Sequence, residues 1–533
     1  MSVLDVRGLT VRLPKGADRA HAVEDITIAV DPGEIVCVVG ESGSGKSVTA
    51  FSVMGLADAR ALTPVAGEIL LEGEDLLTAS RARLRTLRGE KMAMIFQEPM
   101  TALNPVARVG DQIAEVLEIH TDLGRGARKA RVLTAMRDVH LPEPETMYAA
   151  YPHQLSGGQR QRIMIAMALV LEPVLLIADE PTTALDVTTQ AQILGLIKEI
   201  QARKGMGVLF ITHDFGVVAD IADRVVVMQT GRIVEQGPVA DILSAPTHAY
   251  TKMLIGAVPS MTPPARPAAD GAGALAARDL VKEYGHRGAF GGGRVVRAAE
   301  DVTFDIRRGE TLGIVGESGS GKSTVARCTM RLIDPTSGQV LIAGEDIATL
   351  REAAMRPHRK DIQIVFQDPY RSLNPRRTVG QSIVEGPMNF GTSEAEAQAR
   401  AEDLMRVVGL QPEALSRFPH QFSGGQRQRI CIARALAMEP MILIADEAVS
   451  ALDVSVQAQV LDLLDDVRQR FDLAMLFITH DLRVAAQVCD RILVMRQGQV
   501  VEAGPTAAVY ANPTHEYTRA LLAAAPGRAT FAR

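Results

Sequence analysis

The sequence predicts two tandem α/β domains, each built around a parallel sheet. Three observations support this fold class. A chain of 533 residues is too long for one hydrophobic core. The same strings recur in the same order in its two halves, which indicates an internal duplication. In each half, short apolar runs alternate with helix-favouring stretches, which is typical of domains whose parallel strands end at a ligand.

The composition is that of a globular protein and argues against several kinds of partner. Apolar residues make up 47% of the chain and charged residues 23%, which provides ample material for buried cores. The net charge is -6, aromatic residues make up only 4%, and tryptophan is absent. Because nucleic-acid binders need basic surfaces and often stacking platforms, we expect no nucleic-acid partner.

The cysteines and the apolar runs exclude further classes. Cys37, Cys328, Cys431 and Cys489 lie far apart without a CxxC pair, so a zinc site, an iron–sulfur cluster and a disulfide framework are not expected. The N-terminus has no charged-then-apolar pattern of a secretory signal. No uninterrupted apolar run is long enough for a membrane helix, so work at a membrane would need another protein to span it.

The repeated strings define the domain boundaries. GESGSGKS begins at Gly40 and again at Gly316, and the strings around Gln97, LSGGQRQR, LIADE and FITHD also recur. Their spacing between the copies shrinks twice and then stays constant, which indicates short loop deletions in the second copy. We predict domains over 1–256 and 275–533, joined by a semi-extended Pro/Ala/Gly-rich linker over 257–274. Charged stretches over 124–139 and 393–409 predict inserted helices.

A glycine-rich loop of the pattern GxxxxGK[ST] occurs once in each domain. Glycines let successive backbone N–H groups curl around phosphates at the start of a helix. We expect the lysine to reach the terminal phosphates and the following serine to bind Mg²⁺. Because the pattern occurs at equivalent positions in both copies, we do not interpret it as a plain strand-to-helix turn. The predicted ATP-binding residues are Gly40, Glu41, Ser42, Gly43, Ser44, Gly45, Lys46, Ser47 and Val48, and Gly316, Glu317, Ser318, Gly319, Ser320, Gly321, Lys322, Ser323 and Thr324.

Two carboxylates follow a later apolar run in each domain. Asp179 and Asp446 are predicted to hold Mg²⁺, and the next residues, Glu180 and Glu447, to polarise the attacking water as general bases. Acidic pairs at strand ends are often plain surface charges. Their position downstream of a phosphate-binding loop favours the catalytic interpretation.

A histidine ends the next apolar run, at His213 and His480, each within a THD string. Such a side chain could sense and hold the γ-phosphate. An isolated histidine is usually structural, but two equivalent ones favour a functional role.

The string SGGQ begins a predicted helix over 159–171 in the first copy and recurs in the second. Its glycines could let the helix N-terminus bind phosphate, although SGG alone is normally a helix cap. The candidate residues are Ser156, Gly157, Gly158 and Gln159, and Ser423, Gly424, Gly425 and Gln426.

With these motifs the chain resembles the ATP-binding cassette (ABC) family over essentially its whole length. The resemblance implies two P-loop NTPase domains, each with a RecA-like core, an antiparallel β subdomain and an inserted helical subdomain. It also implies a head-to-tail sandwich, in which ATP at Lys46 would face Ser423, Gly424 and Gly425, and ATP at Lys322 would face Ser156, Gly157 and Gly158.

The same resemblance suggests roles for single residues outside these motifs. Gln97 and Gln367 would line the water and Mg²⁺ side, in loops that contact membrane subunits. Asp186 and Asp453 would communicate between the two sites. Tyr284 would stack on adenine or serve as ordinary edge packing, and the matching position in the first copy is Leu13.

Two functions remain open for a twin-cassette protein without membrane helices. One is an importer ATPase, and the other is a soluble ATPase that acts on ribosomes or DNA. The short linker and the absence of clustered cysteines favour the first. The second copy keeps every motif except that Ala448 replaces Pro181.

The finer resemblance is to dipeptide and oligopeptide importer ATPases. It rests on SLNP/ALNP after the glutamines, on HQ[LF]SGGQRQR, and on the terminal PTH-x-YT strings at His248 and His515. The fused form resembles the Yej-type microcin C and peptide transporter ATPases. This implies ATP and Mg²⁺ as cofactors, two integral-membrane permease subunits, and through them a substrate-binding protein. The location implied is peripheral, on the cytoplasmic face of the inner membrane.

The second copy also contains an insertion, RGAFGGGRVVR over 287–297, that the first lacks. A solvated hairpin and a contact with lipid headgroups are both open interpretations.

Overall fold

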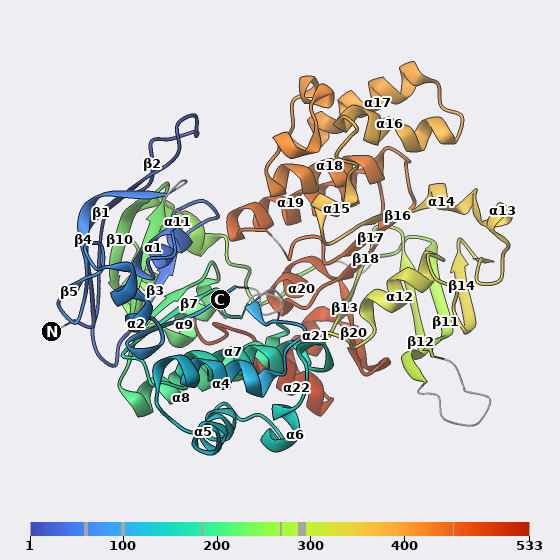
Figure 1. The fold of residues 1–533 in the computed structure, drawn as a ribbon. Helices are drawn as coiled ribbons and strands as arrows, with labels where there is room; N and C mark the ends of the chain where they lie inside the picture. Colours follow the sequence, from blue (N-terminus) through green and yellow to red (C-terminus); the bar gives the residue numbers. More distant parts are fainter. Residues whose placement is uncertain are drawn as a thin grey trace. The chain divides into compact units, whose positions relative to one another are not determined.

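The computed structural model describes residues 2–57, 62–97, 102–182, 185–266, 269–285, 295–450 and 452–531. The chain divides into two compact units, Met1–Val258 and Pro259–Arg533 (Figure 1). Each unit contains one six-stranded and one four-stranded sheet, with equivalent strand orders. This arrangement confirms the predicted α/β class and the predicted duplication.

The six-stranded sheet of the first unit has the order β10-β9-β3-β8-β7-β6 and is parallel apart from β10. Every residue of β3, β7 and β8 is buried, as expected for parallel strands covered on both faces. Its strands are β3 (Ile35–Val39), β6 (Met92–Ile95), β7 (Leu175–Asp179), β8 (Gly207–Ile211), β9 (Arg224–Gln229) and β10 (Arg232–Pro238).

The four-stranded sheet of this unit is antiparallel, with the order β2-β1-β4-β5. One hydrophobic core joins it to the six-stranded sheet and includes Leu4 and Ile26 from one sheet, Val38 and Ile177 from the other, and Val53 from helix α1. The strands are β1 (Leu4–Arg12), β2 (His21–Val30), β4 (Thr63–Leu71) and β5 (Glu74–Asp75).

The helices of the first unit confirm one predicted element and correct another. Helix α5 coincides with the helix predicted over 124–139, and α7 begins at Gly157, two residues before the predicted start. Helices α4 and α5 pack on α7, which in turn packs on β6. The helices are α1 (Lys46–Val53), α2 (Arg81–Glu90), α4 (Val109–His120), α5 (Arg125–Asp138), α6 (Pro144–Tyr148), α7 (Gly157–Leu169), α8 (Val187–Lys204), α9 (Phe215–Ile221), α10 (Val239–Ser244) and α11 (Ala249–Gly256), with a 3₁₀ turn at Pro152–Gln154.

The second unit repeats both sheets, in the orders β16-β17-β18-β13-β19-β20 and β12-β11-β14-β15. The former is parallel apart from β20, and the latter is antiparallel. The strands are β11 (Gly273–Tyr284), β12 (Val296–Arg307), β13 (Thr311–Val315), β14 (Ser337–Ile342), β15 (Glu345–Asp346), β16 (Ile362–Val365), β17 (Ile442–Asp446), β18 (Ala474–Ile478), β19 (Arg491–Arg496) and β20 (Gln499–Pro505).

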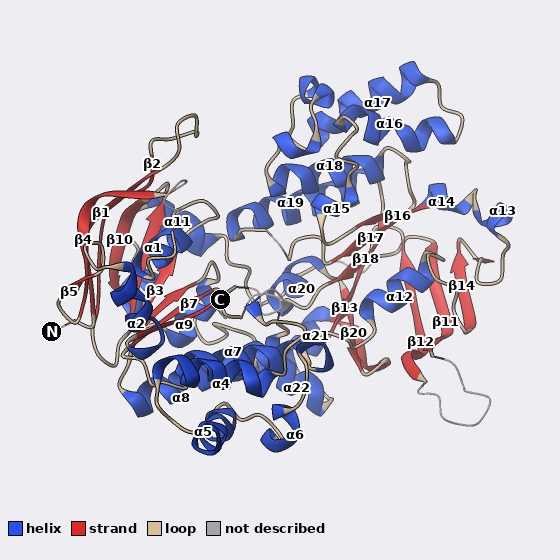
Figure 2. Cartoon of the chain, viewed as in Figure 1, coloured by secondary structure: helices blue, strands red, loops and turns tan. Residues whose placement is uncertain are grey.

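In this unit α16, α17 and α18 pack on one another, and α18 packs on β16. Figure 2 shows these helices gathered on one side of the unit and the strands β11, β12 and β14 on another. Helix α17 coincides with the helix predicted over 393–409. The helices are α12 (Lys322–Thr329), α13 (Glu352–Met355), α14 (His358–Asp361), α15 (Pro369–Ser372), α16 (Val379–Asn389), α17 (Glu394–Val407), α18 (Gly424–Leu436), α19 (Val454–Arg470), α20 (Leu482–Val488), α21 (Thr506–Ala511) and α22 (Glu516–Ala523), with 3₁₀ turns at Pro412–Ser416 and Pro419–Gln421.

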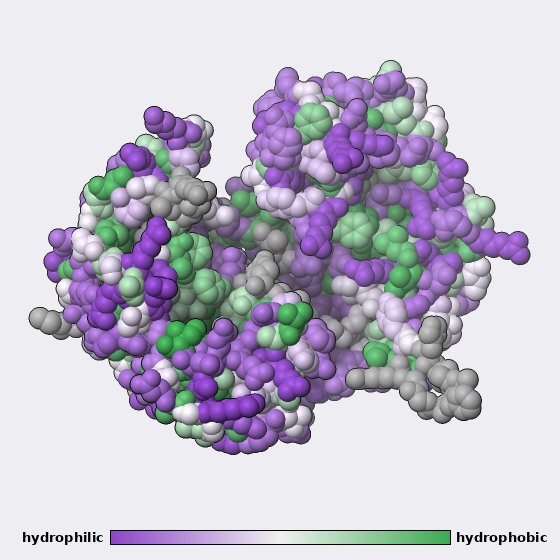
Figure 3. Space-filling view, viewed as in Figure 1, coloured by the Kyte–Doolittle hydropathy of each residue, from purple (hydrophilic) through white to green (hydrophobic). Residues whose placement is uncertain are grey.

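None of the helices among the described residues is both long and apolar enough to cross a bilayer. The face drawn in Figure 3 is mostly hydrophilic, with smaller hydrophobic areas between. All four cysteines are buried and unbonded. Most of the 287–297 insertion lies outside the described residues.

The segment before β11 is irregular but attached to the second unit. Arg266 donates from Nη1 to Val488 O at 2.9 Å and from Nη2 to Gln487 O at 2.6 Å, at the C-terminal end of α20. Its guanidinium also lies 3.6 Å from both Asp465 and Asp490. Gln487 Nε2 donates back to Ser260 O and Thr262 O. A cation at a helix C-terminus is stabilising, so Arg266 fixes this segment to α20.

We expect Arg266→Ala to release this segment. The loss of charge-assisted hydrogen bonds should lower the free energy of local opening by about 1.5–3 kcal/mol, and proteinase K cleavage around 259–266 should be roughly tenfold faster or more. Arg406→Ala, which removes an exposed ion pair with Asp403 inside α17, is the control. Unchanged cleavage of the Arg266 variant would contradict the attachment.

Candidate active sites

The functional side chains of each unit lie at the carboxyl edge of its parallel sheet. In the first unit β3, β8, β7 and β6 run parallel, so their carboxyl ends meet at one edge. The residues that follow these four strands include Gly40, His213, Glu180 and Gln97, respectively. The structure therefore brings together motifs that are far apart in the sequence.

The glycine-rich loop has room only for glycine at two positions. Gly40 has φ 151°, and a Cβ there would lie 2.2 Å from Met228 O, while Gly45 has φ 105° and a Cβ 2.6 Å from Val23 Cγ1. The equivalent Gly316 and Gly321 are equally restricted, at 2.3 Å from Met495 O and 2.1 Å from Ala298 O. Neither α1 nor α12 has a side chain capping its N-terminus, so their first amides are suited to bind an anion. The loops fit the phosphates of a nucleotide.

The lysine of each loop is buried and held by loop carbonyls. Lys46 Nζ donates to Gly40 O at 2.6 Å and to Glu41 O at 3.0 Å. Lys322 Nζ donates to Gly316 O and Glu317 O, both at 2.8 Å. An ammonium group in this position is preset beside the amides of its own loop.

A hydroxyl and a carboxylate form the next pair. Ser47 Oγ lies 3.2 Å from Asp179 Oδ1, and Ser323 Oγ lies 3.2 Å from Asp446 Oδ1. Burial raises the pKa of both aspartates; the neighbouring glutamate raises it further, while the serine hydrogen bond opposes the shift. These are hard oxygen donors of the kind that Mg²⁺ prefers. The described residues contain no group of three or more His, Cys, Asp or Glu side chains that could hold a metal ion.

Each predicted base is held between a glutamine and a histidine. Gln97 Nε2 donates to Glu180 Oε2 at 2.9 Å, and His213 Nδ1 lies 3.1 Å from Glu180 Oε1. In the second unit Gln367 Nε2 donates to Glu447 Oε2 at 2.9 Å, and His480 Nδ1 lies 3.4 Å from the same oxygen. A carboxylate oriented by two such partners is suited to accept a proton from a water molecule.

Both glutamates have strained backbones. Glu180 has φ 47° and Glu447 φ 50°, in the left-handed region that few non-glycine residues occupy. Each N–H is fixed by the neighbouring strand, to Ile211 O and Ile478 O at 2.9 Å. Strain of this kind persists where surrounding contacts over-determine it and is concentrated at functional sites. The sequence alone carried no signal for it.

The glutamates raise the pKa of both histidines, and His480 lowers that of Glu447. Burial would lower the pKa of His213 and His480, but the hydrogen bond and the charge of the paired glutamate raise it above its ordinary value. Burial would raise the pKa of Glu447, but the hydrogen bond and charge of His480 lower it. The pair Glu447–His480 therefore favours its charged form in the folded protein.

The SGGQ strings form capping boxes at α7 and α18. Gln159 N donates to Ser156 Oγ and Ser156 N to Gln159 Oε1, and Ser423 and Gln426 repeat these bonds. The glutamine carboxamides thus serve the cap.

The first and the second glycine of each SGGQ string have different surroundings. A Cβ on Gly158 would lie 2.6 Å from Thr189, and one on Gly425 2.2 Å from Val456, so packing on the next helix requires glycine. A Cβ on Gly157 would approach only Leu185, at 3.7 Å, and one on Gly424 nothing within 4 Å among the described residues. Packing against the described part of the unit therefore does not explain the first glycine.

Asp186, Asp453 and Tyr284, which the sequence also predicted as functional, are not among the residues described above as contacting Glu180 or Glu447. Asp186 caps α8 through Thr189 N at 2.9 Å, and Asp453 is at the N-cap of α19. Tyr284 ends β11 with 43% of its surface exposed and with Lys282 Nζ 5.2 Å above its ring, while Leu13 is half-buried.

Sequence reasoning missed two contacts of the loops. The hydroxyl of Tyr250 accepts a hydrogen bond from Glu41 N, and that of Tyr517 from Glu317 N, both at 3.1 Å. The PTH-x-YT strings, repeated in both copies, are the sequence signal that marks these two tyrosines.

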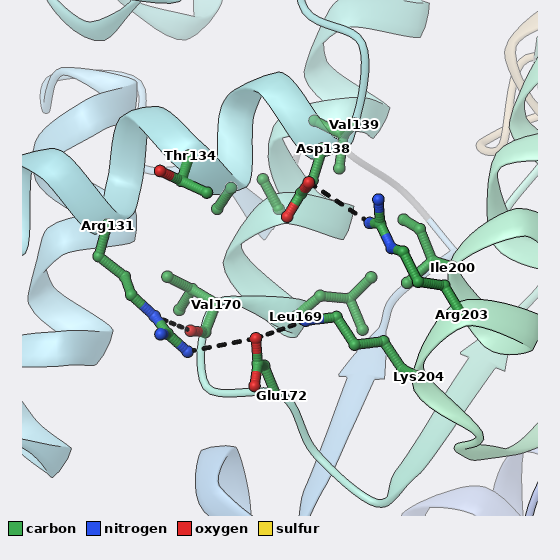
Figure 4. Close-up of a pocket in the computed structure, with 12 residues that line it drawn as sticks. Arg131, Thr134, Asp138, Val139, Leu169, Val170, Glu172, Ile200, Arg203 and Lys204 are labelled. Carbon is green, nitrogen blue, oxygen red and sulfur yellow. Dashed lines mark hydrogen bonds and ion pairs between the residues drawn. The ribbon is translucent and has the colours of Figure 1, made fainter.

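A pocket of about 170 Å³ in the first unit lies elsewhere, between α5, α7 and α8 (Figure 4). Its charged groups are already paired: Glu172 with Arg131 and Lys204, and Asp138 with Arg203. It includes none of the phosphate-loop residues, so it is not the nucleotide site.

The histidine pKa values can be measured by NMR in the nucleotide-free protein. We expect His213 and His480 to titrate above the ordinary value of 6.5. The stabilisation from a raised pKa is complete below 6.5 and is lost as the pH rises through the folded-state value. Glu447→Gln leaves burial as the main influence on His480, so its pKa should fall below 6.5 while that of His213 stays raised. An unchanged His480 would refute the coupling.

Comparison with known proteins agrees with this geometry. The ABC transporter family model matches residues 23–183 and 299–450, and the model of the oligopeptide/dipeptide transporter C-terminal region matches 234–283 and 501–530. The glutathione import ATP-binding protein GsiA of Salmonella typhimurium is 48% identical, over 98% of this chain and 89% of that protein. The same protein of Escherichia coli K12 is 47% identical, over 98% and 90%.

A solved structure of a bacterial ABC transporter cassette, as a dimer, is 26% identical with a TM-score of 0.40 and covers 44% of this chain and 98% of its own. The twofold family match and the full-length relatives lead to one conclusion: this chain belongs to the ABC transporter family, as an ATP-hydrolysing importer subunit with two cassettes in one polypeptide.

Proposed function

We propose that this chain hydrolyses ATP at two sites to drive the uptake of peptides through separate membrane permease subunits. The observation that carries the proposal is the same in both units. In each unit the last residue of a parallel strand is an aspartate that pairs with the serine of the phosphate-binding loop. The next residue is a glutamate with a strained backbone, and a glutamine and a histidine hold its carboxylate.

Each loop would hold the phosphates through its amides and its lysine, Lys46 or Lys322. Ser47 with Asp179, and Ser323 with Asp446, would hold Mg²⁺. Gln97 and Gln367 contact the glutamates that directly follow these aspartates, and we propose them as further Mg²⁺ ligands. When bound, Mg²⁺ supplies positive charge that neutralises the phosphates.

Glu180 and Glu447 accept the proton of the attacking water. Gln97 and His213 orient Glu180 through different oxygens, and Gln367 and His480 both orient Glu447 through Oε2. The raised histidine pKa keeps a positive charge available to hold the γ-phosphate. Tyr284 is proposed to contact adenine in the second site, which its 43% exposed surface allows.

Each site is completed by the other cassette, in our proposal. Lys46 would face Ser423, Gly424 and Gly425, and Lys322 would face Ser156, Gly157 and Gly158. The first glycines support this, because among the described residues of their own unit nothing excludes a side chain there. A ligand at the helix N-terminus would exclude one. Asp186 and Asp453, at the start of the following helices, would report closure from one site to the other.

The permease contacts are assigned to the loops after Gln97 and Gln367. Large apolar side chains are exposed near both: Phe96 at 39%, Val106 at 82% and Tyr370 at 64%. Such residues are favourable in an interface with apolar helices. We propose two permease subunits, a substrate-binding protein acting through them, and a peripheral position on the cytoplasmic face of the membrane.

The substrate class is proposed from the relatives. Two of them are glutathione importers by name, and glutathione is a small peptide, while the matched C-terminal region is that of oligopeptide and dipeptide transporters. We therefore propose short peptides as the solute. No relative reported above acts on ribosomes or DNA.

A pull-down of the full chain from native membranes tests the partners. We expect polytopic permease subunits, identified by mass spectrometry, to co-purify, and Tyr370→Asp with Val106→Asp to weaken the association. Ile119→Asp, which changes another exposed apolar residue, is the control. Recovery of ribosomes or DNA instead of permeases would overturn the transport assignment.

The double variant Glu180→Gln, Glu447→Gln tests the bases. It should still bind ATP but release phosphate about 10²- to 10⁴-fold more slowly, the usual range for a lost general base. Glu172→Gln with Glu439→Gln is the matched control, since these glutamates also have positive φ in equivalent positions but lie outside the sites. Normal turnover in the first variant would show that another group accepts the proton.

A further inference from the structure

A tyrosine from the C-terminal part of each unit closes on the start of the phosphate-binding loop. Tyr250 lies in α11, with 6% of its surface exposed, and its hydroxyl uses both hydrogen-bonding functions on one residue. It accepts from Glu41 N at 3.1 Å and donates to Glu41 Oε2 at 3.2 Å. Tyr517, in α22 and also 6% exposed, accepts from Glu317 N at 3.1 Å.

The tyrosine and the phosphate-binding lysine hold opposite ends of one peptide unit. The N–H of Glu41 and the C=O of Gly40 belong to the same planar group. Tyr250 binds the N–H, and Lys46 Nζ binds the C=O at 2.6 Å. Fixing one end of a rigid plane fixes the direction of the other. Tyr517 and Lys322 hold the peptide between Gly316 and Glu317 in the same way.

The tyrosine is itself anchored to the sheet. Glu235, on β10, accepts from Thr247 N at 2.6 Å, from Thr247 Oγ1 at 2.8 Å and from His248 N at 3.1 Å. His248 Nδ1 then accepts from Tyr250 N at 3.2 Å, which caps α11. Partial burial would raise the pKa of Glu235, but hydrogen bonds from 247–251 hold it at about 2.

The second unit repeats every step of this anchor. Glu502 accepts from Thr514 N at 2.7 Å, from Thr514 Oγ1 at 2.9 Å and from His515 N at 3.1 Å, and His515 Nδ1 accepts from Tyr517 N at 3.1 Å. The PTH-x-YT string therefore forms a continuous set of hydrogen bonds from the last strand of the sheet to the phosphate-binding loop. We call this set of contacts the tyrosine brace, Glu235 to Tyr250 and Glu502 to Tyr517.

We propose that Tyr250 and Tyr517 are positioning residues that preset Lys46 and Lys322 for nucleotide binding. The inference rests on the proposed role of these lysines at the phosphates. It assigns a task to the region that the oligopeptide/dipeptide model matches, 234–283 and 501–530. Because the brace touches neither Glu180 nor Glu447 in the contacts above, it acts on ATP affinity and not on the proton transfer.

The test uses the full chain with Tyr250→Phe, Tyr517→Phe and both together. Phenylalanine keeps the buried ring and removes only the hydroxyl. The loss of a hydrogen bond of ordinary strength at each loop predicts an ATP KM about three- to tenfold higher in the double variant, with kcat within about twofold of the wild type. Equilibrium binding of a fluorescent ATP analogue should weaken by the same factor.

Tyr510→Phe is the matched control. It removes a hydroxyl that donates to Leu482 O at 2.6 Å, away from the phosphate loops. We expect its KM for ATP to be unchanged. Thermal unfolding of every variant checks that the fold is kept.

The possible results separate the brace from the proposed function. A lowered kcat with an unchanged KM, an unchanged double variant, or an equal rise in KM for Tyr510→Phe would each overturn the brace. Lys46→Ala with Lys322→Ala tests the proposed function by itself. If that variant binds ATP as tightly as the wild type, the phosphate role of the lysines is wrong, whatever the tyrosine variants do.

Discussion

The parallel register of four buried strands is the constraint on which each site depends. Val38 pairs with Ile211, Asp179 with Ile211, and Ile95 with Ala178, so the strands end within about one residue of each other. A slip of one residue would turn every side chain to the opposite face. Apart from Asp179, the side chains of β3, β7 and β8 are apolar and buried, so packing on both faces holds these strands in place. The position of Glu180 between Gln97 and His213 follows from this packing, not from any bond formed near it in sequence.

Motifs and periodicity were enough to predict the two units, the phosphate loops and the grouping of the candidate residues at strand ends. The helices α5 and α17 were also predictable, because charged and helix-favouring residues fill them. The positive φ of Glu180 was not, since it arises from the hydrogen bond to Ile211 on the neighbouring strand. Nor was the difference between Gly157 and Gly158, which depends on where Thr189 of another helix lies. The contact of Tyr250 with Glu41 joins residues far apart in sequence, and a single sequence gives no direct signal for such a pair.

The two copies can be compared contact by contact, which shows what they share and where they differ. Both copies keep the lysine with its carbonyls, the serine–aspartate pair, and the glutamate with its glutamine and histidine. They differ at the histidine, which lies against Oε1 of Glu180 but against Oε2 of Glu447, the oxygen that Gln367 also contacts. Such differences leave the chemistry of both sites in place but give each carboxylate its own surroundings.

The attachment of Arg266 to α20 has a consequence for the connection between the two cassettes. Since Ser260, Thr262 and Arg266 are all tied to the second unit, only a few residues around 257–259 serve as the actual tether. A short tether gives each cassette a high effective concentration of the other, on the order of millimolar for short flexible linkers. The pairing that we propose for the two halves would then be a unimolecular event, independent of how much protein the cell makes. Separately encoded cassettes would have to find each other by diffusion, and they could also pair with themselves.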